Sequence, residues 1–168
     1  MPFSKRIFET LDEPVEIEDA ADAVSPKTLK GDIEFKNVTF EYDKDIPVLK
    51  NISFKIKEGQ SVALVGETGS GRSTIGNLMS RFYNVSDDMV FIDGMDINKI
   101  SLNSLRSNMG VMLQDSFIFS GTIADNIRYG KLDATMDEIK EACRVVCADK
   151  FIEKLPDGYD TVVSENAV

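Results

Sequence analysis

Apolar positions near the start of the chain repeat at helical spacing and are followed by a polar stretch. The apolar stripe consists of Phe3, Ile7, Phe8 and Leu11. It predicts a helix over residues 3–13, which Pro14 ends. The stretch from there to Asp32 holds an excess of acidic side chains and a Ser-Pro pair, which is typical of an exposed, solvated linker. We therefore expect residues 1–31 to form a linker helix and an acidic linker ahead of a domain over residues 32–168.

Beyond Asp32 the apolar positions alternate with a period of two. One face of the predicted strand holds Ile33 and Phe35, and the next holds Val38, Phe40 and Tyr42. The phase slip at Lys36–Asn37 between these faces predicts a β-bulge. A turn-like stretch over residues 43–47 leads to a second alternating run that ends at Ile56. The two runs predict a small antiparallel β layer.

At Ser61 the pattern changes to continuous apolar runs separated by helical patterns. The runs typical of strands buried on both faces are Val62–Val65, Met89–Asp93 and Met109–Leu113. A helical face after the first run consists of Ile75, Leu78, Met79 and Phe82, and a short helix is expected at Leu102–Arg106. Strands that alternate with helices predict an α/β layer with a parallel sheet. The remaining segments, 122–128 and 136–152, are predicted to be mainly helical.

The charge balance narrows the class of function. The chain of 168 residues carries 29 acidic against 19 basic side chains, a net charge of −10, and has no histidine. This charge opposes the phosphate attraction that drives nucleic-acid binding, so we expect no nucleic-acid partner. The lack of histidine excludes serine–histidine and cysteine–histidine catalysis and every metal site that contains histidine.

The cysteines and the length of the apolar runs indicate where the chain works. Cys143 and Cys147 are too few for a disulfide framework or a structural zinc site, and their spacing places both on one face of a predicted helix as small buried apolar residues. This favours a reducing, cytoplasmic compartment. No apolar run approaches the ~20 residues of a membrane span, so we expect the chain itself to be soluble.

One glycine-rich segment carries candidate chemistry. It consists of Gly66, Glu67, Thr68, Gly69, Ser70, Gly71, Arg72, Ser73 and Thr74, and it matches the phosphate-binding loop G-x-x-x-x-G-K-[ST] at every position but one. The glycines let successive backbone N–H groups converge on a phosphate, and the following helix directs its positive dipole end at the same anion. The Ser73 hydroxyl is placed to bind Mg²⁺ between two phosphates, and Thr74 to reach a further phosphate. The predicted order of strand, loop and helix agrees with this interpretation.

Arg72 is the position that departs from the motif, which has lysine there. Arginine keeps the positive charge but brings a larger planar group that prefers bidentate contacts. Nucleotide binding is therefore compatible with Arg72, whereas the geometry for phosphoryl transfer is expected to suffer. The alternative is a plain glycine-rich turn between strand and helix, and the loop alone leaves both interpretations open.

The rest of the chain, in collinear order, resembles the first part of the nucleotide-binding domain of an ATP-binding cassette (ABC) transporter of the exporter type. The start resembles the helix and linker that leave the last membrane span of such exporters, in the letters FSKRIFETLDEP. The family's N-terminal β region and first core strand resemble IEFKNVTFEYDKDIPVLKNISFKIKEGQSVALVG. The stretch through the Q-loop resembles MVFIDGMDINKISLNSLRSNMGVMLQDSFIFSGTIADNIRYG, and the segment just before the signature motif resembles KFIEKLPDGYDTVVSENAV.

The resemblance implies a fold, ligands and residue roles. The fold is an α/β P-loop NTPase core with an N-terminal antiparallel β layer and the start of a helical subdomain, and the ligands are ATP and Mg²⁺. Tyr42 stands where the family has an aromatic that stacks on adenine, and Gln114 stands at the Q-loop glutamine, which touches Mg²⁺ or the attacking water. Each residue also has a structural alternative. Tyr42 would then only cover a face of the core, and Gln114 would only be a polar surface residue at the end of a strand. Phe117–Phe119 is either local core or part of the contact with the membrane domain.

The departures from the family pattern shape the expected function. Besides Arg72, the sequence has Ser86–Asp88 in place of a turn glycine, and it contains no Leu-Ser-Gly-Gly-Gln signature, no apolar strand ending in Asp-Glu and no switch histidine. We therefore expect residues 32–168 to be the N-terminal part of such a domain, cut before the signature, which docks Mg-ATP with negligible hydrolysis by itself. The implied partners are a second nucleotide-binding domain and the membrane domain, on the cytoplasmic side of the membrane.

Two other functions compete with this expectation. A non-catalytic nucleotide-binding or structural fragment, acting only by association with other chains, also agrees with Arg72 and the missing motifs. A P-loop kinase for a small acceptor would need a lid with several arginines, whereas only Arg128 and Lys131 are basic between Gly110 and Ile139.

Overall fold

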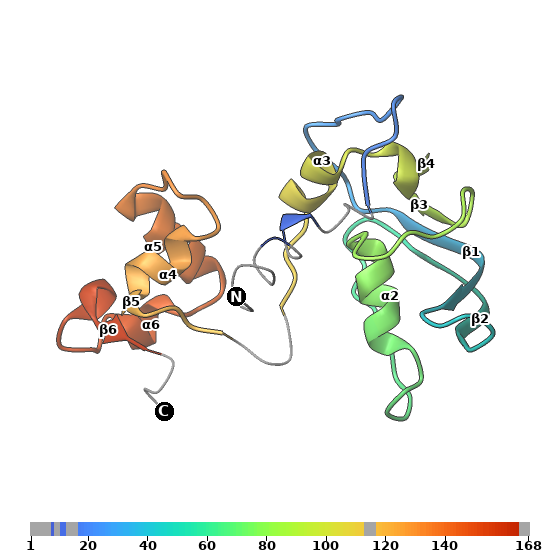
Figure 1. Ribbon diagram of the computed structural model, residues 1–168. Helices are drawn as coiled ribbons and strands as arrows, with labels where there is room; N and C mark the ends of the chain where they lie inside the picture. The colour runs from blue at the N-terminus through green and yellow to red at the C-terminus, as the bar shows by residue number, and fades with distance from the viewer. Residues whose placement is uncertain (1–7, 9–10, 13–16, 113–116, 165–168) are drawn as a thin grey trace. The chain divides into compact units, whose positions relative to one another are not determined.

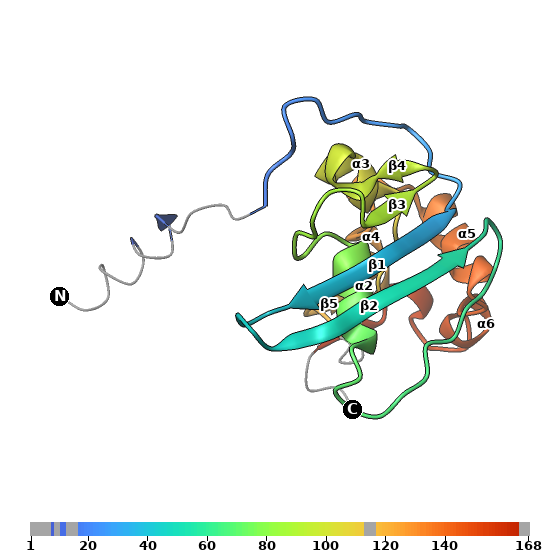
Figure 2. The ribbon, with the colours of Figure 1, turned by 90° about the vertical axis from the view of Figure 1, so that its right-hand side faces the viewer.

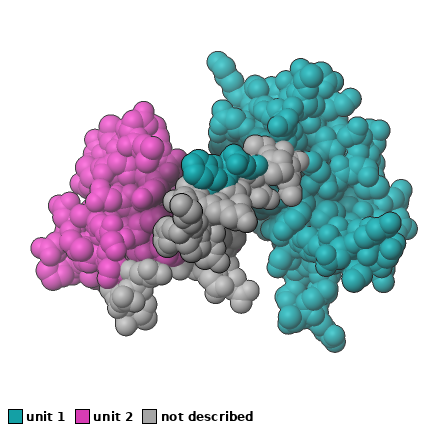
Figure 3. Space-filling model, viewed as in Figure 1, with its two compact units in different colours: residues 1–111 teal, residues 112–168 magenta. Residues whose placement is uncertain are grey.

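The structure is a computed structural model that describes residue 8 and residues 11–12, 17–112 and 117–164. The chain divides into two compact units, Met1–Val111 and Met112–Val168 (Figure 3). The helix expected over residues 3–13 lies largely outside the described residues. Phe8 and Leu11, which belong to its apolar stripe, are helical and exposed.

A four-stranded sheet forms the first unit's framework. Its strands are β1 (Ile33–Glu41), β2 (Pro47–Ile56), β3 (Val90–Ile92) and β4 (Met95–Asp96). They lie in the order β2-β1-β3-β4, and every neighbouring pair is antiparallel. Figure 2 shows β1 and β2 as the two long strands that lie side by side. The antiparallel layer predicted from the alternating pattern is confirmed.

The predicted bulge in β1 is also confirmed. Phe35 pairs with Phe54 of β2, and their rings stack with centroids 4.5 Å apart. The register shifts between Phe35 and Val38, where Asn37 adopts a left-handed backbone conformation with φ of 48°. The extra residue therefore corrects the alternation, so that Phe35 and Val38 both point into the core.

Short helices cover the sheet and close the first core. They are α2 (Arg72–Met79), the 3₁₀ turn η1 (Ile97–Lys99) and α3 (Leu102–Ser107). Figure 1 shows α2 and α3 beside the sheet. The core consists of Phe35, Val38, Leu49, Ile75, Leu78, Val90, Ile92, Ile97, Ile100 and Leu105. The helix α2 thus packs on the sheet through Ile75 and Leu78, as its apolar spacing predicts.

The mixed α/β class is as predicted, but the residues that the structure describes do not form the parallel sheet expected within it. Residues 61–66 form no strand, and Val65 is 89% exposed. The run that begins at Met109 is likewise irregular through Met112, which is 94% exposed, and Leu113 lies outside the described residues. A strand buried on both faces needs a hydrogen-bonded neighbour. The described part of the chain offers these runs none, while β3 finds its partner in β1 in antiparallel orientation.

The acidic linker is mostly exposed over the part that the structure describes, as predicted, but its backbone is also docked on the first unit, which the sequence did not predict. Val24 forms an isolated parallel bridge with Ile100: its N–H donates to the carbonyl of Lys99 at 2.8 Å, and the N–H of Ser101 donates to the carbonyl of Val24 at 2.9 Å. The N–H of Leu102 donates to the carboxylate of Asp19 at 2.7 Å. Backbone pairing of this kind cannot be predicted from the polarity of the side chains.

The second unit is mainly helical, as predicted. Its elements are β5 (Gly121–Thr122), α4 (Ile123–Arg128), α5 (Met136–Val145), α6 (Asp149–Ile152), η2 (Gly158–Asp160) and β6 (Val162–Val163). A separate core holds Ala124, Ile139, Cys143, Ile152 and Tyr159. In the portions of both units that the structure describes, no helix is long and apolar enough to cross a membrane.

The prediction that both cysteines are buried on one helical face is wrong for Cys147. The helix α5 ends at Val145, and Cys147 lies in the following turn with a φ of 59°. Cys143 is buried, whereas Cys147 is exposed. The break after Val145 turns the chain, so the four-residue spacing no longer places the two side chains on one face.

Candidate functional site

The glycine-rich loop lies between the exposed stretch 61–65 and the start of α2. Gly69 and Gly71 have φ of 85° and 87°, a left-handed conformation that glycine adopts without strain. The N–H of Ser70 donates to the carbonyl of Glu67 at 3.1 Å, which closes a turn inside the loop. Residues 66–70 are exposed. The loop is therefore a tight turn whose backbone is open to solvent.

Two glycines of the loop have close neighbours where a side chain would begin. A Cβ on Gly66 would lie 2.5 Å from Oγ of Ser70, and a Cβ on Gly71 would lie 2.6 Å from Cδ2 of Leu49. Leu49 is a buried core residue of β2, so the second contact is with a fixed side chain. Close packing and left-handed geometry thus both require glycine at position 71.

The first turn of α2 carries no capping side chain. Its N-cap is Gly71, which makes no side-chain hydrogen bond, and the first turn holds no acidic residue. The N–H groups of a first helical turn have no partner within the helix, and the helix dipole makes this end attractive to anions. Arg72 and Ser73 are exposed at this end. The arrangement fits a phosphate group, and an exposed hydroxyl such as that of Ser73 is a ligand Mg²⁺ takes together with phosphate oxygens.

Tyr42 and Thr74 lie together although they are far apart in the sequence. The hydroxyl of Tyr42, just after β1, donates to Oγ1 of Thr74 in α2 at 3.1 Å. Thr74 is buried, so this contact is protected from water on the side of the helix. The Thr74 hydroxyl, for which the sequence predicts a phosphate contact, therefore already accepts one hydrogen bond and still has its own proton to donate.

Two residues that the sequence reasoning missed support Tyr42. Asn77 donates from Nδ2 to the hydroxyl of Tyr42 at 3.3 Å. Tyr83 meets the ring of Tyr42 edge-on with centroids 4.8 Å apart, and Phe40 does so at 4.9 Å. The available signal for Asn77 was its spacing of three residues after Thr74 on the same helix. Nothing in the local pattern pointed to Tyr83, because its contact with Tyr42 is tertiary.

Gln114 lies outside the described residues. Its predicted contact with Mg²⁺ or water stays a prediction. The residues that the structure does bring together are those of the loop and Tyr42, all within the first unit.

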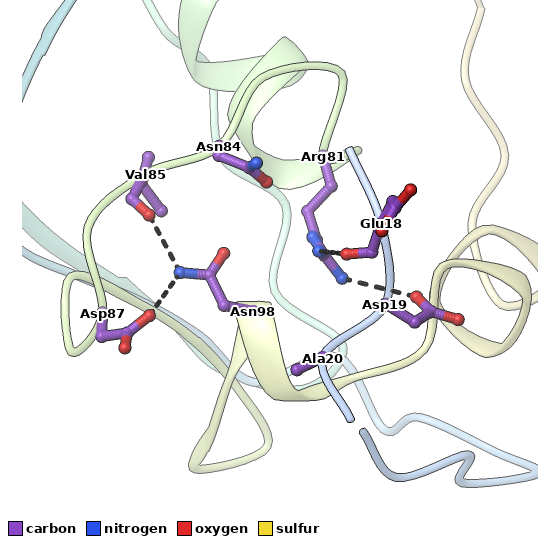
Figure 4. Close-up of a pocket in the computed structure, with 8 residues that line it drawn as sticks. All are labelled: Glu18, Asp19, Ala20, Arg81, Asn84, Val85, Asp87 and Asn98. Atoms are coloured by element: carbon purple, nitrogen blue, oxygen red, sulfur yellow. Dashed lines mark hydrogen bonds and ion pairs between the residues drawn. The ribbon is translucent and has the colours of Figure 1, made fainter. Parts of the chain in front are cut away.

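A separate pocket of about 300 Å³ in the first unit involves none of the predicted site residues (Figure 4). Its lining consists of Glu18, Asp19, Ala20, Arg81, Asn84, Val85, Asp87 and Asn98. Arg81 is only 2% exposed and donates to the carbonyls of Ile100 at 2.8 Å and Glu18 at 3.1 Å. Burial lowers the pKa of Arg81, and the carboxylate of Asp19 acts in the opposite direction. These contacts attach the linker to the end of α2.

Three aromatic rings cluster on the second unit. The rings of Phe117 and Phe119 lie 4.8 Å apart, and Phe119 stacks on Tyr129 at 4.2 Å. All three side chains are exposed, as is Ile118. The alternative in which this segment is local core is therefore wrong, and we call Phe117, Phe119 and Tyr129 the aromatic patch.

Comparison with known proteins identifies relatives of this chain. The family model described as ABC transporter matches residues 49–165. The uncharacterized ABC transporter ATP-binding protein YfiC of Bacillus subtilis is 49% identical over 97% of this chain and 27% of its own length. The mitochondrial iron-sulfur clusters transporter ATM1 of Debaryomyces hansenii is 43% identical over 98% of this chain and 24% of its own length.

A solved structure agrees as well. A bacterial Atm1-family ABC exporter with ATP bound has a TM-score of 0.84 and 38% identity over 96% of this chain and 29% of its own. The chain spans about a quarter of the length of the curated relatives it matches. Since the family match takes in well over half of its residues, this chain belongs to the ABC transporter family, in the ATP-binding part of such proteins.

Proposed function

We propose that this chain is the module of an ABC exporter that docks Mg-ATP and so powers transport across a membrane in the whole protein. The observation that carries the proposal is the start of α2. There an uncapped helical turn follows a loop in which only glycine fits at position 71. Backbone N–H groups and a helix dipole bind a phosphate even in a chain of net charge −10.

Each residue of the site has a proposed role. The loop Gly66–Thr74 holds the phosphates, with Arg72 adding its charge and Thr74 its hydroxyl proton. Ser73 and Gln114 hold Mg²⁺, which neutralises phosphate charge when bound. Tyr42, which is 43% exposed, offers its ring to the adenine base.

The proposed partners are a second nucleotide-binding domain and the membrane domain, with the chain on the cytoplasmic side of the membrane. One relative is described as a fatty acid ABC transporter ATP-binding/permease protein, at 44% identity over 96% of this chain. The exposed aromatic patch supports a partner contact in the second unit, because clustered exposed rings mark interaction sites. We propose that it faces the membrane domain.

A second candidate is a non-catalytic nucleotide-binding or structural fragment that acts by association with other chains. Arg72 favours it, because the guanidinium is exposed at the first position of α2 where the motif has the more compact lysine. In both cases we expect hydrolysis by residues 1–168 alone to be negligible.

Calorimetric titration of the chain with Mg-ATP tests the proposal. We expect binding in the micromolar to low-millimolar range. Arg72→Lys should tighten binding, whereas Arg144→Lys, an exposed exchange of the same kind in α5, should leave it unchanged. If neither the unaltered chain nor Arg72→Lys binds Mg-ATP, the docking function is contradicted. The structural fragment is then the function that remains. Steady phosphate release by the chain would contradict its expected lack of turnover.

A further inference from the structure

Three polar side chains form a continuous hydrogen-bonded chain between the proposed base site and the phosphate-binding helix. Asn77 Nδ2 donates to the hydroxyl of Tyr42 at 3.3 Å, and that hydroxyl donates to Oγ1 of Thr74 at 3.1 Å. Asn77 and Thr74 both belong to α2, whereas Tyr42 lies beyond the end of β1. The hydroxyl of Tyr42 is therefore held between two residues of the helix that begins at the phosphate loop.

The direction of donation is the same along the whole chain. The Tyr42 oxygen accepts from Asn77 and gives its proton to Thr74, so Thr74 accepts one bond and keeps its own proton free to donate. Thr74 is 4% exposed, so water competes little for its oxygen.

Two further aromatic rings pack against the ring of Tyr42. Tyr83 and Phe40 lie nearly perpendicular to it, at interplanar angles of 80° and 89°. Tyr42 nevertheless remains 43% exposed, which leaves part of the ring accessible to a planar ligand. The hydroxyl is occupied by protein partners, so a base would meet the ring surface rather than the hydroxyl.

From these contacts we infer that Asn77 is a positioning residue. Through the hydroxyl of Tyr42 it holds the base platform at a fixed place on the phosphate-binding helix. This inference rests on the proposed function, because it takes Tyr42 as the surface that meets the base. A tethered ring loses less freedom when a nucleotide binds, so the tether strengthens binding of ligands that have a base and no others.

The contrast between Mg-ATP and inorganic triphosphate with Mg²⁺ tests the inference, since only ATP has a base. Calorimetry on the full chain compares Asn77→Ala, Tyr42→Phe and their combination. Each single change should weaken Mg-ATP binding about threefold to tenfold, as expected for one hydrogen bond, and leave triphosphate binding unchanged. The double variant should lose much less than the product of the two single losses, because both changes break the same chain.

A matched control and a structural check accompany these variants. Asn103→Ala replaces an exposed asparagine of α3 and should alter neither affinity. Circular dichroism and urea unfolding establish that each variant is folded. Tyr42→Phe removes only an oxygen atom and keeps the test decisive if Asn77→Ala does not fold.

The outcomes separate the inference from the function on which it rests. Unchanged Mg-ATP affinity in Tyr42→Phe and Asn77→Ala overturns the inference, and so does an equal loss for ATP and triphosphate. Tyr42→Ala tests the function: if it leaves the preference for ATP over triphosphate intact, then Tyr42 is not the base platform. If Tyr42→Ala removes that preference and Asn77→Ala leaves it unchanged, the base platform stands and only the tether fails.

Discussion

Gly71 at the start of α2 lies directly against Leu49 of β2. A Cβ on Gly71 would lie 2.6 Å from Cδ2 of Leu49, and Leu49 is itself 2% exposed in the core. The sheet therefore determines where α2, the helix proposed to bind phosphate, begins. This contact joins the packing of the β layer to the geometry of the proposed binding loop. A substitution that disturbs one is therefore expected to disturb the other.

Gly71→Ala should destabilise the first unit. The substitution forces alanine into a left-handed conformation at about 1–2 kcal/mol and overpacks the core at about 1–3 kcal/mol more. Gly69→Ala is the matched control, because Gly69 has nearly the same φ but nothing within 4 Å of its Cβ. Urea unfolding should show a clearly larger loss for Gly71→Ala, and equal losses would contradict the contact with Leu49.

Gly76→Ala should raise the free energy of unfolding, whereas Gly71→Ala should lower it. Gly76 lies inside α2, and a Cβ there meets nothing within 4 Å. Alanine restricts the unfolded chain and favours the helix, so we expect a gain of about 0.5–1 kcal/mol in the free energy of unfolding. Gly59→Ala, also unobstructed but at a φ of 72°, should instead be destabilising. Urea unfolding of both variants measures this difference, and a loss in Gly76→Ala would contradict the helical conformation of α2.

Arg81→Lys should loosen the linker from the first unit. Lysine keeps the charge but cannot reproduce the fork that binds the carbonyls of Ile100 and Glu18. We expect a loss of about 1–3 kcal/mol in the free energy of unfolding, because the buried carbonyl of Ile100 and the half-buried one of Glu18 lose charged donors. Amide hydrogen exchange should speed up at Val24 and Ser101, whose N–H groups form the bridge of the docked linker. Arg144→Lys is the control, and unaltered exchange in Arg81→Lys would show that the linker does not depend on Arg81.

Acid should release the cap of α4. Thr122 and Asp125 form a capping box, and the hydrogen bond from the Thr122 hydroxyl holds the pKa of Asp125 below its ordinary value. Because the folded pKa lies below the unfolded one, the stabilisation is full above the unfolded value and is lost as the pH falls through the folded pKa. A carboxyl titration by NMR should give the lowered pKa, and Thr122→Ala should raise it. An ordinary pKa for Asp125 in the unaltered chain would contradict the capping box.

Alkylation should distinguish the two cysteines. Cys147 is exposed in a turn, whereas Cys143 is 3% exposed in the second core. Iodoacetamide should therefore modify one thiol in the folded chain and both in urea. Cys147→Ser should abolish the reaction of the folded chain, as mass spectrometry will show. Modification of Cys143 under native conditions would contradict its burial.

Local patterns predicted much of the fold. The alternation along β1 and β2, the bulge at Asn37 and the helices α2 and α3 were all readable from the sequence, because each depends on neighbouring residues. The loop Gly66–Thr74 was readable for the same reason: its glycines and hydroxyls stand at fixed spacing. The prediction of a buried strand at Val62–Val65 was wrong, because a strand forms only where a partner strand is available to pair with it.

By itself, the sequence determined the family, the glycine-rich loop as a candidate for phosphate and Tyr42 as a candidate for the base. Only the tertiary structure decided what holds these residues: Leu49 against Gly71, Asn77 and Tyr83 around Tyr42, and Arg81 at the linker. The physical reason is distance along the chain. Turns and helices follow from interactions between near neighbours, whereas these contacts join residues brought together only when the β layer packs on α2.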